Sequence, residues 1–452
     1  MTDPTLVRAD AMPAGAPEAA VAIVGAGACG LTAALMLRDA GIDCVLLERD
    51  SQAQGSTALS SGFIPAAGSQ VQRAAGVLDD SAERFAQDIQ AKAQGTAATH
   101  LVAAYSRAAG RALDALQSRH GLGFELLDGF LYPGHTVRRM HTLPQRTGAA
   151  LMAALQAAAD RAGATLLTSA LVRELWFGAN DQLLGVGYLR PDGKLEHLAC
   201  RALLLACNGF AGNRGMVQEW LPEMCGAVFA GHAGNDGSAI QWGQQLGAGL
   251  ADLGGYQGHG SWALPQGALI TWALMAQGGI QVNRFGERFH DETQGYSEAA
   301  VHVLAQPEGL AWDLFDTRLL ELARGFPDFR SAEAAGALRQ AKDLNALAQL
   351  IGCDAAGLGG TLASTRLEPP YCAVQVTGAL FHTQGGLAIN EQCRVQRENG
   401  QTFPNLWAAG GAARGVSGNA VWGYLSGNGL LSAVAGGYIA AHSMADPLGA
   451  GR

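Results

Sequence analysis

The first fifty residues carry the clearest pattern of apolar and polar positions in the chain. Residues 21–24 form a short apolar run, and residues 31–41 place apolar side chains at helical spacing. Residues 44–50 form a second apolar run that ends in charged residues, and the segment GAGACG separates the first run from the helical one. This order predicts one βαβ unit of about thirty residues, with a glycine turn between its first strand and its helix.

Similar patterns recur along the chain. Helical spacing predicts helices over 81–93, 99–121 and 148–164, and apolar runs predict strands over 165–172 and 201–207. From about Ala251 the pattern becomes irregular, and strand-like alternation returns over 375–386. The last segment, 406–442, predicts a strand, a glycine-rich loop and a long apolar helix. The elements together predict an α/β fold.

Length and composition narrow the class of protein. A chain of 452 residues exceeds what one hydrophobic core usually serves, so we expect two domains, or one large domain with an insertion. Hydrophobic residues make up 48% and charged residues 15%, which excludes a disordered chain. The net charge is −9 without a long Lys/Arg block, so no nucleic acid partner is expected. The 62 glycines predict many places where backbone approaches another group closely.

The remaining composition signals concern location. The eight cysteines form no Cys-x-x-Cys pair, which argues against a zinc site or a disulfide framework and favours buried thiols in a reducing compartment. Residues 1–18 lack the apolar region of a secretory signal and are expected to form a flexible arm. Apolar stretches stay shorter than the ~18 residues of a transmembrane helix. We therefore expect a cytoplasmic protein without a transmembrane segment.

The glycine turn has the spacing of a dinucleotide site. Gly25 permits the tight turn, Gly27 lets a pyrophosphate reach the backbone, and Gly30 lets helix and strand pack closely. Glu48 ends the second strand, where a carboxylate can hold ribose hydroxyls. The alternative is a glycine turn that binds nothing. The motif by itself fits FAD and NAD alike; its position near the N-terminus, together with the glycine-rich C-terminal segment, favours FAD.

Six sequence blocks in a fixed order carry a more specific signal. With them the chain resembles the flavoprotein family that contains soluble fumarate reductases, succinate dehydrogenase flavoprotein subunits and 3-ketosteroid dehydrogenases. The blocks are GAGACGLTAAL, GSTALSSGFIPAAG, LLLACNGFAGN, GGIQVNRFGERFHDET, FHTQGGLAIN and LWAAGGAARG with GYLSGNGLLSA. The resemblance implies a Rossmann-like FAD-binding domain built from both chain ends, 19–251 and 382–452, with an inserted α+β capping domain over 252–381.

The resemblance also implies a set of FAD-binding residues. Gly411 stands where the family's AAGE block has a carboxylate, and no histidine lies near Ser56, where membrane-bound members attach flavin covalently. We therefore expect non-covalent FAD. The implied residues are Gly25, Ala26, Gly27, Cys29, Gly30, Glu48, Arg49, Ser56, Thr57, Ser60, Gly62, Val172, Asn208, Gly209, Gly410, Asn428, Gly429, Leu430 and Leu431.

At the substrate end, the sequence departs from the fumarate reductases. His259 and His382 match the two substrate-binding histidines of that group, but Tyr296 and Tyr424 stand where it has arginines. The positions of its proton relay carry Trp272 and Met275. A phenol cannot replace a guanidinium in bidentate carboxylate recognition, so a dicarboxylate is a poor candidate substrate. Tyrosines at these two places are similar to those of 3-ketosteroid Δ1-dehydrogenases.

The resulting hypothesis is α,β-dehydrogenation of a ketone, with cyclic or steroid-like ketones as candidates. Tyr424 donates to the carbonyl oxygen, Tyr296 as phenolate takes the α-proton, and the β-hydride passes to flavin. Because a free phenol titrates near pH ~10, Tyr296 needs its pKa lowered by neighbours. His259 and His382 are both candidates for that role or for orienting the substrate.

Three further groups have two interpretations each. Arg138, Arg139 and His141 lie in a loop that either lines the pocket or serves only structure; they are the remaining candidates for an anionic substrate group. Arg288 and Glu292 are expected to tie the cap together. A third group forms either an apolar wall for an uncharged ring or ordinary aromatic core: Tyr256, Trp262 and Trp272.

Other functions stay open on the sequence. The same site can run in reverse and reduce an unsaturated acid or an enone, or the chain can bind FAD without turnover. A nicotinamide dehydrogenase is disfavoured, because only one glycine-turn unit is present and the C-terminal GNGLL segment fits FAD. No Cys-x-x-Cys-His heme motif occurs, so we expect an external electron acceptor alongside a small-molecule substrate that is uncharged or weakly anionic.

Overall fold

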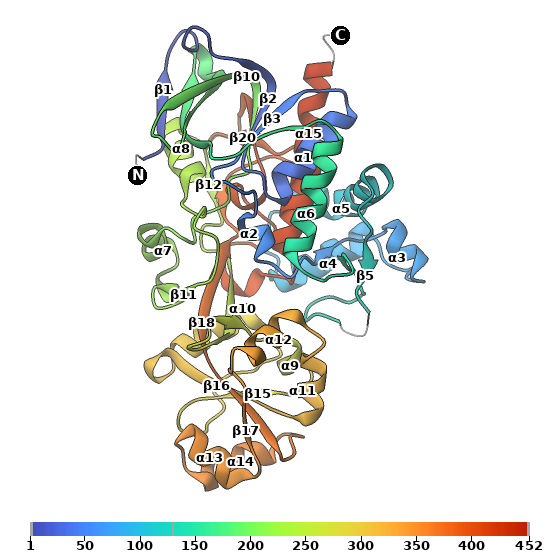
Figure 1. Cartoon of the computed structure of the whole chain (residues 1–452), viewed down its shortest axis with the longest axis vertical. Coiled ribbons are helices and arrows are strands. Elements are labelled where there is room, and N and C mark those ends of the chain that lie inside the picture. The colour runs from blue at the N-terminus through green and yellow to red at the C-terminus, as the bar shows by residue number, and fades with distance from the viewer. Residues whose placement is uncertain (1–2, 129–130, 450–452) are drawn as a thin grey trace.

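A computed structural model describes residues 3–128 and 131–449, and it shows an elongated molecule with two parts (Figure 1). The upper part contains both the blue N-terminal and the red C-terminal segments of the chain, and the lower part contains the yellow and orange middle segments. Each part has its own sheet and its own hydrophobic core. An insertion between two halves of the upper part therefore accounts for the shape.

A sheet of nine strands, counted within the described residues, forms the centre of the upper part. Its middle strands are nearly continuous runs of Val, Ile, Leu and Ala, which is typical of strands covered on both faces. The strands follow the order β1 (Thr5–Arg8), β8 (Leu171–Phe177), β9 (Leu183–Leu189), β10 (Leu195–Leu205), β2 (Glu18–Val24), β3 (Cys44–Leu47) and β7 (Thr165–Leu167), while β21 (Thr402–Ala408) pairs with β10 and β20 (Arg394–Gln396).

The helices of the upper part bury the faces of this sheet. The C-terminal helix α15 (Asn428–Gly449) packs tightly on α1 (Ala28–Asp39), since a Cβ atom at Gly437 would lie 2.4 Å from the Cys29 carbonyl oxygen. The other helices of this part are α2 (Gly55–Ala58), α3 (Gln70–Ala74), α4 (Ala82–Lys92), α5 (Thr99–His120), α6 (Gly148–Arg161), α7 (Arg214–Trp220) and α8 (Ser238–Leu246). Two small sheets complete it: β4 (Ile64–Pro65) with β6 (Met140–Thr142) and β5 (Glu125–Leu126), and β12 (Leu250–Ala251) with β19 (Gly386–Leu387).

The N-terminal segment differs from the sequence expectation. Residues Thr5–Arg8 were expected within a flexible arm, but they form strand β1 in parallel register with β8. Gln245 on α8 holds this strand from the side, since it accepts from the Leu6 amide and donates to the Pro4 carbonyl. An edge strand without a strongly apolar pattern leaves little sequence signal, which explains the difference.

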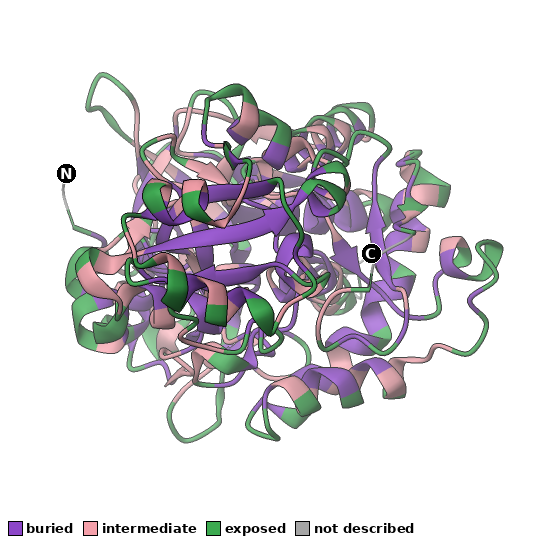
Figure 2. Ribbon diagram, turned by 90° about the horizontal axis from the view of Figure 1, so that it is seen from below, coloured by how far each residue is buried: buried purple, intermediate pink, exposed green. Residues whose placement is uncertain are grey.

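The lower part is a sheet with short helices around it. Seen from below, the strands are buried and the exposed residues lie on the surrounding helices and loops (Figure 2). Its strands follow the order β14 (Ala268–Leu269), β13 (Tyr256–Ala263), β18 (Tyr371–Thr383), β16 (Leu310–Asp316) and β15 (Ile280–Val282), with β11 (Val228–Phe229) and β17 (Arg339–Ala341) also paired to β18. The helices are α9 (Ala273–Ala276), α10 (Tyr296–Leu304), α11 (Thr317–Ala323), α12 (Pro327–Ala334), α13 (Leu344–Ile351) and α14 (Ala355–Ala363).

Strand β18 runs from the lower sheet toward the upper part and brings His382 with it (Figure 1). The expected domain boundary between residues 381 and 382 falls inside this strand. The division into 19–251 with 382–452 and 252–381 therefore stays a prediction. The strand itself places the end of the inserted segment directly at the junction of the two parts.

Within the ranges that the structure describes, no single helix is long and apolar enough to cross a membrane. Only the bent pair α13 and α14, which meet at 115°, reaches the required length and composition together.

Candidate active site

One large cavity lies at the junction of the two parts, with a volume of about 2050 Å³ including its open mouth. Its wall is formed by both ends of the chain and by the inserted segment. All four residues expected to act on the substrate, Tyr296, Tyr424, His259 and His382, line it.

The first glycine turn lies at one end of the cavity, between β2 and α1. Gly25 has a φ of +103°, and a Cβ atom there would lie 2.5 Å from the Ala206 carbonyl oxygen. A Cβ at Gly30 would lie 2.0 Å from the Gly25 carbonyl oxygen, so Gly30 packs beneath the turn and does not face the cavity. Gly27 and Cys29 do face it. The N-cap residue Gly27 has no side chain to cap α1, and the Thr57 hydroxyl accepts from the first helical amide only, so this helix end is suited to a phosphate.

Glu48 lies beside this turn at the end of β3. Its Oε2 accepts from the Ala26 amide at 3.0 Å, and its Oε1 accepts from the Asp50 amide at 3.0 Å. The two backbone donors fix the carboxylate, whose remaining lone pairs can accept from ribose hydroxyls. Arg49 and Val172 line the same end of the cavity. Ala26 acts here through its amide and does not itself line the wall.

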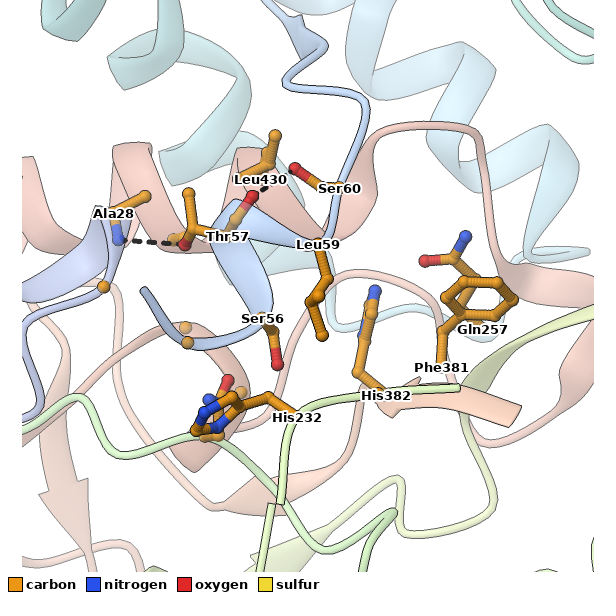
Figure 3. A pocket seen from close by; sticks show the side chains of 18 of the residues that line it. Ala28, Ser56, Thr57, Leu59, Ser60, His232, Gln257, Phe381, His382 and Leu430 are labelled. Atoms are coloured by element: carbon orange, nitrogen blue, oxygen red, sulfur yellow. Dashed lines mark hydrogen bonds between the residues drawn. The ribbon is translucent and has the colours of Figure 1, made fainter. Parts of the chain in front are cut away.

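The segment around α2 forms the next stretch of wall (Figure 3). The Thr57 hydroxyl accepts from the Ala28 amide at 3.1 Å and so serves the start of α1. The Ser60 hydroxyl donates to the Thr57 carbonyl at 2.7 Å, and the Ser56 hydroxyl accepts from Asn235 Nδ2 at 3.0 Å. These residues and Gly62 line the cavity, but their hydroxyls already have protein partners. Their main contribution is therefore the shape of the wall.

The second glycine turn and the start of α15 complete the expected cofactor site. Asn208, Gly410, Gly429 and Leu430 line the cavity. Three other expected residues lie behind the wall: Gly209 packs against Thr383, Asn428 donates to the Ser417 hydroxyl at 2.9 Å, and Leu431 is fully buried in the core.

Buried polar atoms without a protein partner give an independent test of the fit. Ser432 Oγ and Trp242 Nε1 line the cavity, are buried, and have no hydrogen-bond partner among the described residues. Such orphaned groups are costly unless a ligand or water satisfies them. Ser432 lies in the first turns of α15 and Trp242 in α8, at separate places on the wall. Orphaned polar atoms, a helix N-terminus at the cavity wall and the fixed Glu48 carboxylate together fit FAD.

At the substrate end, four aromatic rings form a contiguous group. The Tyr296 and Tyr424 ring centroids lie 6.1 Å apart. His259 stacks on Tyr296 at 5.0 Å, and His382 meets Tyr424 at 5.7 Å. His382 comes from β18 beside Phe381, and both appear across the cavity from Ser56 in Figure 3. The fold thus brings together residues that lie up to 165 positions apart in the chain.

Both histidines at this end are neutral at physiological pH. Burial lowers the pKa of His259 to about 3 and that of His382 to about 4. The Ser261 amide donates to His259 Nδ1 at 3.1 Å, which puts the ring proton on Nε2. His259 therefore contributes a neutral donor and not a charge.

The charge state of Tyr296 differs from the expectation. Burial raises the pKa of Tyr296 well above its ordinary value, and the neighbouring Tyr424 adds to the effect. A hydrogen bond with the Ser426 side chain lowers the pKa but does not outweigh burial. The expected help from His259 or His382 is absent, because a neutral imidazole does not stabilise a phenolate by charge.

The loop at 138–141 does not offer cations to the cavity. Arg139 is fully buried and forms ion pairs with Asp80 and Asp88. Arg138 pairs with Asp128. His141 contacts the Ser69 hydroxyl at 2.6 Å. The interpretation of these residues as an anion site is wrong, because carboxylates of the protein and buried hydrogen bonds already engage them.

Two further expectations concern the Arg288–Glu292 pair and the aromatic residues of the cap. Arg288 is paired with Glu292, whose Oε1 also accepts from the Gln281 amide at 2.8 Å, so this pair does tie the cap together. Of the three aromatic residues considered for an apolar wall, only Trp272 lines the cavity. Tyr256 is buried and donates to Glu223 at 3.0 Å.

Several wall residues were not predicted from the sequence. Near the substrate end, the cavity is also lined by Ser61, Tyr132, Gln257, Leu269, Thr271, Phe326, Asp328, Phe381 and Ser426. Ser61, Phe381 and Ser426 lie within the recognised sequence blocks but were not among the expected site residues, and the others come from separate segments outside those blocks. Only the folded arrangement brings them together.

Comparison with known proteins is consistent with this geometry. A family model described as FAD binding domain matches residues 20–430. The chain is 26% identical to the NADH:fumarate oxidoreductase of Klebsiella pneumoniae over 94% of this chain and 47% of that protein, so it spans about half of that relative. It is 24% identical to the 4-oxocyclohexanecarboxylate 2-dehydrogenase of Sinomonas cyclohexanicum over 87% of each chain.

Two solved structures are similar in fold. The open conformation of a flavocytochrome c3 fumarate reductase superposes with a TM-score of 0.81 at 24% identity, covering 96% of this chain and 79% of that one. The 3-ketosteroid-Δ4-(5α)-dehydrogenase from Rhodococcus jostii, in complex with 4-androstene-3,17-dione, gives a TM-score of 0.77 at 23% identity, covering 97% and 100%. At these identities the likeness concerns the fold alone.

Proposed function

The chain belongs to the FAD binding domain family, and from this premise we propose that it is a FAD-dependent oxidoreductase that dehydrogenates a cyclic ketone at its α and β carbons. The observation that carries the proposal is the pair of phenols, Tyr296 and Tyr424, at an end of the cavity without cations. Among the described lining residues, the one Arg or Lys is Arg49, beside Glu48 at the ribose end. A neutral carbonyl substrate suits such a site better than a dicarboxylate does.

Tyr424 is the proposed carbonyl-binding residue. Its phenol oxygen lies 3.4 Å from the Gly429 amide, which donates to it at the start of α15. Burial raises the pKa of Tyr424, so the group keeps its proton. Because the oxygen already accepts from the backbone, its own proton is available to a ketone oxygen. A donor aimed at that oxygen stabilises the negative charge that develops as the α-proton leaves.

Tyr296 is the proposed group that exchanges the α-proton, at its phenol oxygen. In dehydrogenation this oxygen must start as phenolate, and the hydrogen bond with Ser426 stabilises that form. FAD, when bound, supplies the acceptor for the β-hydride. The neutral His259 and the buried Trp272 keep the surroundings of Tyr296 dry, and His259 Nε2 offers a further donor for positioning.

The relatives support a cyclic ketone as the substrate class. One sequence relative is named for 4-oxocyclohexanecarboxylate, and one structure of similar fold holds a steroid dione. The Klebsiella relative is named for fumarate, which requires recognition of two carboxylates. Among the described residues, the substrate end of this cavity has no Arg or Lys for that task. We further propose that the electrons leave to an acceptor outside this chain.

The raised pKa of Tyr296 favours one second candidate, the reverse reaction on an enone. A neutral phenol is ready to donate a proton to the α-carbon, whereas dehydrogenation must first deprotonate it. The same residues serve both directions, with Tyr424 on the carbonyl oxygen in each. The two candidates therefore differ in direction and in the starting protonation state of one residue.

Anaerobic mixing of the purified holoenzyme with substrates tests the proposal. Bleaching of the oxidised flavin by cyclohexanones or 3-ketosteroids is the expected result, and Tyr296→Phe should abolish it while FAD stays bound. Tyr371→Phe, a tyrosine of the lower part that is not among the lining residues, is the matched control and should bleach normally. Reoxidation of the reduced enzyme by cyclohexenone without bleaching by any ketone would select the reverse reaction. Reoxidation by fumarate would contradict the proposal.

A further inference from the structure

One carboxylate at the substrate end has no counter-charge. Three described acidic residues line the cavity: Glu48, Asp236 and Asp328. Glu48 is held by two backbone amides, and Asp236 is held by Ser238 and lies within ion-pair distance of Arg49 and Arg173. Asp328 forms no ion pair with any described residue. A partly buried carboxylate without a cation is costly, so a polar partner from outside the chain would stabilise it.

The local contacts hold Asp328 at the cavity wall. It lies in the first turn of α12, next to Phe326, which also lines the cavity. The Ser61 hydroxyl, from the opposite part of the molecule, donates to Asp328 Oδ2 at 3.1 Å. Oδ1 accepts no hydrogen bond from the described residues, so it is the oxygen left for a ligand. Burial raises the pKa of Asp328, and the hydrogen bond from Ser61 opposes the rise.

Asp328 also lies within electrostatic range of Tyr132, which lines the cavity near the substrate end. Burial raises the pKa of Tyr132, and the charge of Asp328 adds to the rise. The side chains of Leu269, Phe326 and Phe381 make most of the surrounding wall apolar. A ligand that reaches from Tyr424 across this wall thus meets one carboxylate and no described Arg or Lys.

We propose that Asp328 is a specificity-determining residue, which binds a hydrogen-bond-donating group, a hydroxyl or an ammonium, on the ketone and repels a carboxylate from the same place. The proposal rests on the proposed function, because it names the polar group that the ketone carries. It separates this chain from its relative named for 4-oxocyclohexanecarboxylate, whose substrate carries a negative charge. A hydroxyl and an ammonium share the donor chemistry, and only the ammonium adds a charge.

Binding in the Tyr296→Phe holoprotein tests the inference without turnover. The probes are cyclohexanones with a methyl, hydroxyl, amino or carboxylate group at carbon 4, and homologues of the amine and the acid lengthened by one methylene. Calorimetry is expected to rank the amine and the hydroxyl above the methyl compound and the carboxylate last. Asp328→Asn keeps the shape of the side chain and can still accept from Ser61. It should lower the affinity for the amine by about tenfold or more and raise the affinity for the carboxylate. The methyl compound should bind equally to both proteins.

The controls separate this inference from the proposed function. Glu333→Gln removes a carboxylate from the same helix, outside the cavity, and should change no affinity. If Asp328→Asn lowers the affinities for the amine and the hydroxyl compound equally, the contact is a hydrogen bond. If it lowers the affinity for the amine alone, the contact depends on charge. Both results support the inference. If the ratio of amine to carboxylate affinity stays within about threefold on Asp328→Asn at both probe lengths, the inference is wrong. The same holds if no probe binds the parent.

Bleaching of wild-type flavin by 4-methylcyclohexanone reports on the proposed function alone, because this probe carries no donor. Bleaching by this probe can occur even if Asp328→Asn leaves the ratio of affinities unchanged. Conversely, the ratio can change even if the probe does not bleach the flavin. Should Asp328→Asn lose FAD, Asp328→Ser takes its place in the same comparison, with FAD content measured for each protein before titration.

Discussion

Tyr424 is positioned by the backbone of the helix that follows it, and its hydroxyl carries the first prediction. Tyr424→Phe removes the donor to the ketone oxygen but leaves the ring beside His382. We expect the rate of flavin bleaching by ketones to fall by about 10²–10³-fold, the usual effect of losing one oxyanion donor. Stopped-flow absorbance measures the rate, and the absorbance ratio of flavin to protein checks that FAD remains bound. A fall of less than about threefold would remove Tyr424 from carbonyl activation.

Tyr296 makes a prediction about pH. Burial raises its pKa, so at neutral pH only a small fraction is phenolate, and this fraction grows about tenfold per pH unit until the pH reaches the pKa. The rate of ketone dehydrogenation should therefore rise with pH across neutral and alkaline values. The reduction of an enone, which uses the neutral phenol, should stay level over the same range.

The pH profile of the bleaching rate tests this assignment. The histidines do not interfere, since His259 and His382 titrate at pKa values of about 3 and about 4. A bleaching rate that is already level at neutral pH would show that Tyr296 is not the base, or that bound FAD and ketone lower its pKa. The residual rate of Tyr296→Phe should show no such slope.

The residues of the substrate end show how much of the site can be predicted from the sequence at the scale of single residues. Tyr296, Tyr424, His259 and His382 could be named because each occupies a position in a recognisable block. Their charge states could not be predicted from the sequence, because burial by residues from distant segments sets each pKa. Asp328 had no signal at all, since its neighbour Ser61 lies 267 positions away in the chain.

At the scale of elements, α4 of the upper part and α10 of the lower part meet through an ion pair. Lys92 forms it with Glu298 and also donates to the Gln294 carbonyl at 2.7 Å. The two charged side chains are only 14% and 11% exposed, so loss of one partner leaves the other charge poorly solvated. Lys92→Met should lower the free energy of unfolding by about 3 kcal/mol. Thermal unfolding of the FAD-saturated protein measures the change as a lower Tm.

The double variant provides the control for this pair. Lys92→Met with Glu298→Met replaces both charges, so it should recover much of the lost stability. If the double variant is less stable than either single variant, the pair contributes little, and each side chain matters for other contacts. Tyr296 starts α10, so the single variant should also slow ketone bleaching.

Elements with strong periodicity were predictable from sequence, and weak ones were not. The βαβ unit around Gly25 forms as expected, because local spacing and the glycine turn agree. Strand β1 was missed, because its pairing with β8 depends on tertiary contacts. Gly30 shows that a motif does not separate contact residues from packing residues. It was expected among the FAD-binding residues, but in the structure it packs beneath the glycine turn, the other role expected of it.

At the scale of the whole molecule, the cavity lies where the inserted segment meets the upper part, which is built from both ends of the chain. The family assignment follows from blocks spread over residues 20–430 and confirms the resemblance seen in the sequence. The identity of FAD was predictable for the same reason. The lack of cations among the described lining residues of the substrate end was predictable only in part, since the loss of two arginines could be seen in the sequence but the pairing of Arg139 with Asp80 and Asp88 could not.

The attachment of FAD is a property of this whole cavity. Histidine and cysteine side chains at the wall are candidates for a covalent bond to flavin. His232 lies near Ser56 (Figure 3), but its Nδ1 accepts from the Gly234 amide at 3.0 Å and its Nε2 lies 3.0 Å from Asp50. Burial raises the pKa of Cys207 to about 12 and that of Cys29 further, so neither presents a thiolate.

We therefore expect acid to release the cofactor from the protein. Below pH ~3 the carboxylates that form the ion pairs of the fold become protonated, the protein unfolds, and a cofactor held only by the folded wall must dissociate. Precipitation of the holoenzyme with trichloroacetic acid should leave all FAD in the supernatant, measured by its absorbance against the protein precipitated. A fluorescent protein band on a denaturing gel would contradict non-covalent binding.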